Sequence, residues 1–221
     1  MTPELTEAII SCKACERLVI HREKVAQYPP LRYRGQTYWS RGVPGWGDPK
    51  ARLWIIGLAP AAHGANRTGR MFTGDMSGEW LYRILYEMGW STRPQSLHRE
   101  DGLELKGVYI SAAVRCAPPQ NRPTASELKT CFPFLQQEWE RLRPTVKALM
   151  PLGHIAYCQT LRLLGIQQQL SFAHGKYWKH EDWWIVCSYH PSQQNTYTRR
   201  LTWAAWEAVF RLAKQLCGGN R

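Results

Sequence analysis

Four cysteines are placed where they could hold a metal centre together. Cys12 and Cys15 form a Cys-x-x-Cys pair near the start of the chain, whereas Cys116 and Cys131 lie in its second half. Thiolates bind both zinc and iron–sulfur clusters, so the ligand type leaves both open. The spacing differs from the two Cys-x-x-Cys pairs of a zinc ribbon and favours a cluster. The other cysteines lie among apolar residues and are predicted to be small buried side chains: Cys158, Cys187 and Cys217.

A loop rich in small residues follows an apolar run at 52–57 and extends from Gly57 to Asp75. Small residues let the backbone approach a ligand closely, and ordinary turn geometry is the alternative explanation for the glycines. Asp75 could act in catalysis, could cap the helix that follows, or could do both. The basic residues of the loop could contact phosphates: His63, Arg67 and Arg70.

His190 begins a second polar segment, 190–196, which follows the apolar run 183–189. A single histidine after a strand is often structural. Here the polar residues that follow it, and its expected place at the same sheet edge as Asp75, favour a functional role. Ligands of open α/β sheets bind beyond the carboxyl ends of the strands, and both segments are expected there.

Alternating strands and helices would position these residues. Short apolar runs at 52–57, 108–114 and 146–152 are predicted to be buried strands, and the segments 173–178 and 183–189 are predicted to pair as a hairpin. Helical spacing of apolar residues and capping patterns predict the helices 77–88, 124–143, 153–164 and 202–216. This order predicts an α/β fold in which helices cover both faces of a parallel or mixed sheet.

The segment 27–49, called the flap below, mixes basic and aromatic residues with glycine and proline. Guanidinium groups pair with phosphates and aromatic rings stack on bases, so this composition is typical of nucleic-acid grooves. An irregular layer that covers the core is the alternative. The residues concerned are Arg32, Tyr33, Arg34, Tyr38, Trp39 and Arg41.

The composition limits the class of protein. The chain has 221 residues, of which 44% are hydrophobic, and 29 Lys and Arg against 17 Asp and Glu give a net charge of +12. These values predict one folded domain over 1–221 and exclude a disordered chain. We find no long apolar run and no signal peptide, so we expect no membrane span and a cytoplasmic protein. The positive charge favours an anionic partner such as nucleic acid.

Taken together, the loop 57–75, the His190-Pro-Ser motif and the four cysteines resemble the iron–sulfur uracil-DNA glycosylases, most closely family 5. The resemblance covers nearly the whole chain. It implies a three-layer αβα fold around a central four-stranded parallel sheet and a structural 4Fe-4S cluster held by Cys12, Cys15, Cys116 and Cys131. It further implies a monomer that removes uracil and other deaminated bases, such as hypoxanthine and xanthine, from double- and single-stranded DNA.

The resemblance also assigns catalytic roles. Asp75 would activate water or stabilise the sugar, and His190 would donate a hydrogen bond to the carbonyl oxygen O2 of the base. Phe72 would stack on the extruded base, and packing beneath the loop is the alternative for its ring. The loop holds no lysine that could form a Schiff base with the sugar, so a monofunctional enzyme is expected.

Two positions suggest loose base choice. Related enzymes often carry a polar, water-positioning residue near Leu58 and Ala59, and an asparagine that reads uracil where Ala112 stands. Without those groups, fewer wrong bases are rejected. Arg199 also stands where the family often has glycine. The remaining expected contacts are Gly57, Ala59, His63, Ala112 and Asn121 at the base and Arg67, Arg70, Gln194 and Asn195 at the DNA.

Two other classes of protein would share some of these features. A non-catalytic, metal-stabilised nucleic-acid-binding module would use the same charge and cysteines, but it would have no need of Asp75 and His190 at one sheet edge. An RNA-processing or nucleotide hydrolase is the second alternative. Assays on RNA and free nucleotides beside DNA would separate it from a DNA glycosylase.

Overall fold

The strands of this protein form one mixed sheet at its centre. The structure, a computed structural model, describes residues 2–168 and 170–218. Within them, a six-stranded sheet has the order β1-β3-β2-β4-β6-β5. The strands are β1 (Trp46–Gly47), β2 (Leu53–Gly57), β3 (Val108–Ala112), β4 (Ala148–Pro151), β5 (Tyr177–His180) and β6 (Trp183–Val186). The four inner strands are parallel, as expected, and β1 and β5 add an antiparallel strand at each edge.

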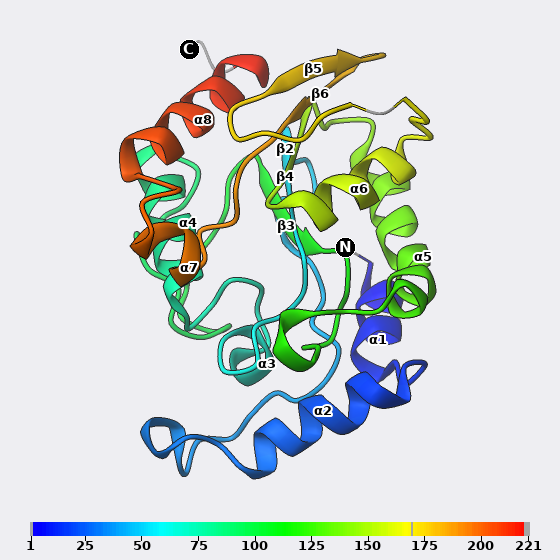
Figure 1. Cartoon of the computed structure of the whole chain (residues 1–221), viewed down its shortest axis with the longest axis vertical. Helices are drawn as coiled ribbons and strands as arrows, with labels where there is room; N and C mark the ends of the chain where they lie inside the picture. The colour runs from blue at the N-terminus through cyan, green and yellow to red at the C-terminus, as the bar shows by residue number, and fades with distance from the viewer. Residues whose placement is uncertain (1, 169, 219–221) are drawn as a thin grey trace.

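Helices cover both faces of the sheet (Figure 1). The longer helices are α1 (Pro3–Ser11), α2 (Glu16–Gln27), α4 (Met76–Glu87), α5 (Ala125–Leu142), α6 (His154–Leu163) and α8 (Trp203–Leu216). Alternate residues of β2 face opposite sides, as the pleat of a strand requires. Leu53 and Ile55 pack in a core with α4 and α8, whereas Trp54 and Ile56 pack in a core with α5 and α6. This arrangement is the expected three-layer αβα architecture.

Side-chain caps begin the helices close to the predicted positions. Thr124 accepts a hydrogen bond from the Glu127 N–H, and the Glu127 carboxylate accepts one from the Thr124 N–H, which completes the predicted capping box of α5. Thr202 caps α8 in the same way through the Ala205 N–H. Polar side chains at these positions satisfy backbone groups that the first helical turn leaves unpaired.

The flap combines both alternatives that its sequence left open. Helix α2 continues through Gln27, so the non-helical part begins one residue later than predicted. Tyr38 and Val43 are buried and cover the core, whereas the side chains of Arg32 and Arg34 are exposed. The short strand β1 also lies within the flap, and its two residues give no apolar run by which the sequence could have revealed it.

Two short helices complete the connections that matter for the site: α3 (Ala65–Thr68), inside the loop that follows β2, and α7 (Gln193–Tyr197), after β6. Both therefore follow the carboxyl end of a parallel strand. Among the described residues, no helix combines the length and apolar character needed to cross a membrane.

Candidate active site at the carboxyl edge of the sheet

The segments after β2 and β6 meet through two rings. The Phe72 ring lies 5.7 Å from the His190 ring, centroid to centroid, with 30° between their planes. Beneath Phe72 lies Gly57, where a Cβ atom would come within 2.9 Å of the ring. A side chain at position 57 would therefore displace the ring. Phe72 is only 8% exposed, so its ring packs against the core as well as against His190.

Asp75 stands at the start of α4 and caps it. Its Oδ1 accepts a hydrogen bond of 2.9 Å from the Gly78 N–H, which confirms the predicted capping role. Burial raises the pKa of Asp75, while the backbone N–H groups of Gly78 and Ser77 oppose this rise. The other carboxylate oxygen points to Gly64, where a Cβ atom would overlap it. Capping thus uses one oxygen and leaves the second for other chemistry.

His190 is held as a neutral imidazole. Burial lowers its pKa to about 4, so the ring carries no charge near neutral pH and has one N–H to donate. Its backbone carbonyl accepts a hydrogen bond of 2.8 Å from Asn195 Nδ2. Ser192 caps α7 through the Asn195 N–H. The polar residues after His190 therefore fix its backbone, and Gln194 on α7 is exposed.

His63 and Arg67 connect the loop to the flap. The Tyr38 hydroxyl lies 2.9 Å from His63 Nδ1, and the Tyr33 ring stacks on His63 at 5.9 Å. Burial lowers the pKa of His63. Arg67 donates to the His63 carbonyl, to Gln36 Oε1 and to the Gly74 carbonyl. Both predicted ligand contacts thus have internal partners, which fix the flap against the loop.

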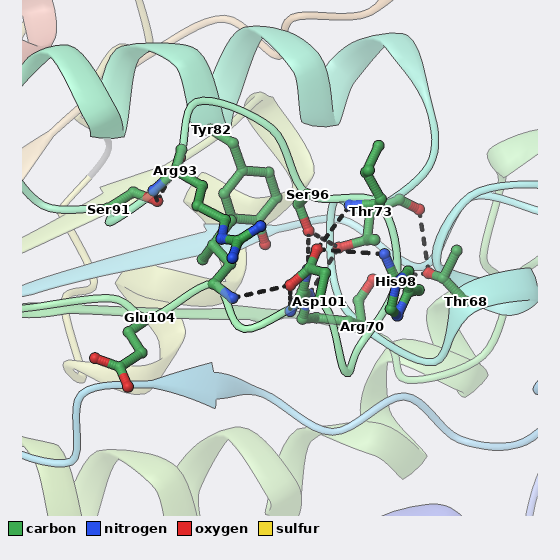
Figure 2. A network of polar contacts seen from close by, with 12 residues as sticks. Thr68, Arg70, Thr73, Tyr82, Ser91, Arg93, Ser96, His98, Asp101 and Glu104 are labelled. Atoms are coloured by element: carbon green, nitrogen blue, oxygen red, sulfur yellow. Dashed lines mark hydrogen bonds and ion pairs between the residues drawn. The ribbon is translucent and has the colours of Figure 1, made fainter.

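Arg70 is a correction. It was expected to face DNA, but it is 5% exposed and forms a bidentate ion pair with Asp101, at 3.0 Å from Nη1 and 2.5 Å from Nη2 (Figure 2). Ser96 and Thr73 accept its remaining hydrogen bonds. Four of the five N–H groups of this buried guanidinium are bound inside the fold, so Arg70 is not available to a phosphate and the DNA-binding prediction for it is wrong.

Three other predicted positions are small or exposed. Ala112 ends β3 and is paired in register with Gly57 at the end of β2. Ala59 is half-buried beside the cysteine-lined part of the core. Asn121 is exposed at the end of a short 3-10 turn and has a positive φ of 56°.

The four predicted cysteine ligands line one small cavity of about 20 Å³ between α2, α5 and the chain after β3. Arg22 Nη1 donates to Cys116 Sγ at 2.9 Å, and the Arg115 N–H donates to Cys131 Sγ at 3.3 Å. Burial raises the pKa of Cys131 to about 12. In the part of the chain that the structure describes, no group of three or more His, Cys, Asp or Glu lies close enough to hold a single metal ion.

The remaining cysteines are a mixed outcome. Cys187 and Cys217 are buried, which confirms the prediction for them. Cys158 is exposed on α6, so its predicted burial is wrong. Helix α6 buries one face and exposes the other, and Cys158 lies on the exposed face. Its apolar neighbours in the sequence did not indicate on which of the two faces it would lie.

Comparison with known proteins decides the family. A sequence model described as the Uracil DNA glycosylase superfamily matches residues 44–213. The chain belongs to this superfamily. It is 48% identical over 219 residues to a type-5 uracil-DNA glycosylase of Mycobacterium leprae, covering 98% of this chain and 96% of the relative. A type-5 uracil-DNA glycosylase of Thermus thermophilus is 45% identical, with 96% of each chain covered.

More distant members of the superfamily are also similar to this chain over most of its length. A type-4 uracil-DNA glycosylase of Archaeoglobus fulgidus is 28% identical, covering 97% of this chain and 92% of the relative. The similarity to type-5 members is the greater of the two, in agreement with the resemblance to family 5.

The sequence did not reveal Asp101 or Tyr38 as partners of the loop, because neither belongs to a motif and both approach it from distant segments.

Proposed function

We propose that this chain excises uracil from DNA by hydrolysing the bond between base and sugar, leaving an abasic site. The observation that carries the proposal is the Phe72–His190 ring pair at the carboxyl edge of the sheet, in which Phe72 comes from the same loop as Asp75. The full-length similarity to proteins named uracil-DNA glycosylases supports it.

Each of the three side chains has a chemical task in this proposal. A duplex hides the reacting bond, so the nucleotide must first be extruded, which costs a few kcal/mol and least for a mispaired base. Phe72 offers a ring on which the extruded base stacks. Neutral His190 donates a hydrogen bond to the base carbonyl oxygen as negative charge develops there, a contact of a kind that supplies about 3 kcal/mol.

Asp75 completes the reaction. Its carboxylate stabilises the positive charge that develops on the sugar, orients the attacking water, or does both. Burial raises its pKa, and a higher pKa makes the carboxylate a better proton acceptor. The loop 57–75 holds no lysine, so no covalent link between the protein and the sugar forms there and the enzyme is monofunctional.

The DNA contacts come from exposed groups beside this edge. Arg32 and Arg34 of the flap are exposed and suit phosphates, and Gln194 is exposed on α7, next to the turn that carries His190. Asn195 uses its Nδ2 on the His190 carbonyl and retains Oδ1 for the DNA. The net charge of +12 favours such binding as a whole. The enzyme acts as a monomer on double- and single-stranded DNA.

Base choice extends to hypoxanthine and xanthine. Leu58, Ala59 and Ala112 offer no side-chain hydrogen bond, so a stacking ring and a single histidine contact accept more than one flat base. Excision assays on matched duplexes with each base test this. Ala112→Asn should raise the preference for uracil over hypoxanthine. Activity of the unaltered chain on uracil alone would contradict loose recognition.

A 4Fe-4S cluster held by Cys12, Cys15, Cys116 and Cys131 is the second part of the proposal. The donor set suits such a group, because four thiols line one cavity and an N–H donates to the sulfur of Cys116 and to that of Cys131. Burial raises the pKa of these two thiols, so a neighbouring cation would be needed to make them thiolates. When bound, the cluster would have a structural role, because it would link the segment between α1 and α2, which holds Cys12 and Cys15, to Cys116 after β3 and to Cys131 on α5.

The direct test compares two duplexes that differ in one base. The protein is incubated with a uracil-containing duplex and with its uracil-free counterpart, and alkali-labile sites are counted after strand separation. We expect alkali-labile breaks at the uracil only. A non-catalytic nucleic-acid-binding module would bind both duplexes and produce no breaks, and a nucleotide or RNA hydrolase would act on free nucleotides or RNA instead.

A further inference from the structure

Phe72 has an uncommon backbone conformation. Its φ is 53°, in the left-handed region that bulky residues other than glycine rarely adopt. Such a conformation is strained and persists only when the surroundings determine it. The contacts that hold the residues on either side of Phe72 are therefore the contacts that fix its ring against Gly57 and His190.

A buried polar network holds the residue after Phe72. Thr73 Oγ1 lies 2.6 Å from Ser96 Oγ and accepts a hydrogen bond of 3.2 Å from Arg70 Nε (Figure 2). Arg70 also donates to Ser96, and its two terminal nitrogens bind Asp101. Thr73 is thus connected to Asp101 through Arg70, which it contacts both directly and by way of Ser96.

Asp101 anchors this network to the segment between α4 and β3. It accepts backbone hydrogen bonds from Leu97, at 2.8 Å, and from Leu103, at 3.0 Å, in addition to the Arg70 guanidinium. Burial alone would raise the pKa of Asp101, but the hydrogen bonds of Arg70 and of the backbone hold it well below its usual range. The carboxylate therefore stays ionised wherever the protein is folded near neutral pH.

The residue before Phe72 is held from the other side. The Tyr82 hydroxyl donates to the Met71 carbonyl at 2.8 Å, and Trp46 Nε1 donates to the Tyr82 hydroxyl at 3.1 Å. The Arg70 guanidinium lies 4.6 Å from the centre of the Trp46 ring, so the same arginine contributes to the contacts on both sides of Phe72. Met71 and Thr73 are consequently both fixed, with Phe72 between them.

We propose that Thr73, Ser96 and Asp101 are positioning residues for base recognition, which fix the Phe72 ring at the place where the extruded base stacks. The inference rests on the proposed excision of uracil and adds residues that contact neither base nor sugar. A buried ion pair is weak evidence for stability alone, because well-packed apolar residues often serve as well. A fully satisfied polar network instead specifies one geometry, which is what a strained ring position requires.

Matched variants test the positioning role. Ser96 and Ser91 are both serines of the same segment, 8% and 7% exposed, but Ser91 donates only to the Arg93 carbonyl. Ser96→Ala therefore removes a contact of the network and Ser91→Ala does not. In the same way, Thr73→Val removes the hydroxyl at nearly constant volume, whereas Thr73→Ser retains it. Asp101→Asn removes the charge that faces Arg70.

Three quantities are measured for each variant: the single-turnover excision rate, the melting temperature, and an affinity ratio. The ratio compares a duplex carrying 2′-fluoro-substituted deoxyuridine, which resists hydrolysis, with the undamaged duplex. We expect Thr73→Val, Ser96→Ala and Asp101→Asn to lower the rate at least about tenfold and the ratio several-fold, with affinity for undamaged duplex nearly unchanged. Thr73→Ser and Ser91→Ala should remain close to the unaltered protein.

The outcomes separate this role from the proposed function. If the unaltered protein excises uracil and Ser96→Ala behaves like Ser91→Ala in rate and ratio, the positioning role is wrong while the function stands. Equal loss of affinity for damaged and undamaged duplex in the folded variants would also contradict it. If the unaltered protein neither excises uracil nor prefers the modified duplex, the proposed function fails and the positioning role fails with it. Should Asp101→Asn not fold, Thr73→Val and Ser96→Ala still decide.

Discussion

Gly64 and Asp75 lie so close together that a Cβ atom on residue 64 would overlap the Asp75 carboxylate. Gly64 has a φ of −97° and a ψ of −104°, a combination outside the α and β regions that other residues adopt, so its backbone favours glycine. The space at this position favours glycine as well, because one carboxylate oxygen of Asp75 caps α4 through the Gly78 N–H and the other is directed at Gly64. The absence of a side chain at residue 64 therefore sets where the second oxygen of Asp75 can lie.

Gly64→Ala should consequently lower single-turnover excision by at least about tenfold, since a displacement of about 1 Å at a reacting group can cost a hundredfold. The closest atom to such a Cβ is an oxygen of the Asp75 carboxylate, so the effect should be smaller in a protein that lacks this carboxylate. A double-mutant cycle with Asp75→Ser measures this coupling. Equal effects of Gly64→Ala with and without Asp75 would show that residue 64 acts elsewhere.

His190 should make the protein less stable in mild acid. Its pKa is about 4 in the folded chain and about 6.5 in an unfolded one, so the unfolded state takes up the proton first. The stability that the neutral ring contributes is present above about pH 6.5 and is lost as the pH falls toward 4. The melting temperature of His190→Ala should therefore fall less between pH 7 and pH 5 than that of the unaltered protein. An identical fall in both would contradict a half-buried His190 that stays neutral.

The flap should carry part of the salt dependence of DNA binding. Each phosphate contact releases counterions, so affinity for undamaged duplex should fall steeply as salt is added. The double substitution of Arg32→Ala and Arg34→Ala should reduce the slope of log affinity against log salt concentration by about 2. A matched control removes two exposed charges near the opposite, amino edge of the sheet, Arg143 and Lys147, ahead of β4. The control should leave the slope unchanged. A flat salt titration of the unaltered protein would exclude phosphate contacts as the main source of affinity.

The cysteine cavity should hold iron. Protein purified without oxygen should be brown and should contain iron and labile sulfide. Cys12→Ser should lower the melting temperature more than Cys158→Ser, because Cys12 lines the cavity whereas Cys158 is exposed outside it. Removal of a structural metal site destabilises the fold that binds it. Zinc in place of iron and sulfide would overturn the cluster, and equal melting temperatures of the two variants would remove the structural role.

Local patterns predicted the framework of this fold. The strands β2, β3 and β4 appear as short apolar runs and α5 begins at a capping box, because burial and capping leave their mark within a few residues. The place of Asp75 and His190 at one sheet edge followed from the strand order. The pairing of Arg70 with Asp101 could not be predicted from the strand order, because Asp101 comes from an irregular segment and the pairing depends on tertiary contact alone.

The same distinction explains the flap. Its composition predicted both a cover for the core and a basic surface, and the structure assigns buried Tyr38 to the first and exposed Arg32 and Arg34 to the second. Composition describes a segment as a whole, whereas exposure differs from one residue to the next.

Asp75→Ser tests most directly whether the Asp75 carboxylate acts in the excision of uracil, since serine retains the cap of α4 and removes the carboxylate. The measurement is single-turnover release of uracil from one duplex by Asp75→Ser and by the unaltered protein, at matched stability and saturating protein. We expect a rate at least about a hundredfold lower for Asp75→Ser, with nearly unchanged affinity for the duplex and nearly unchanged melting temperature. Excision by a folded Asp75→Ser protein at the rate of the unaltered chain would contradict it.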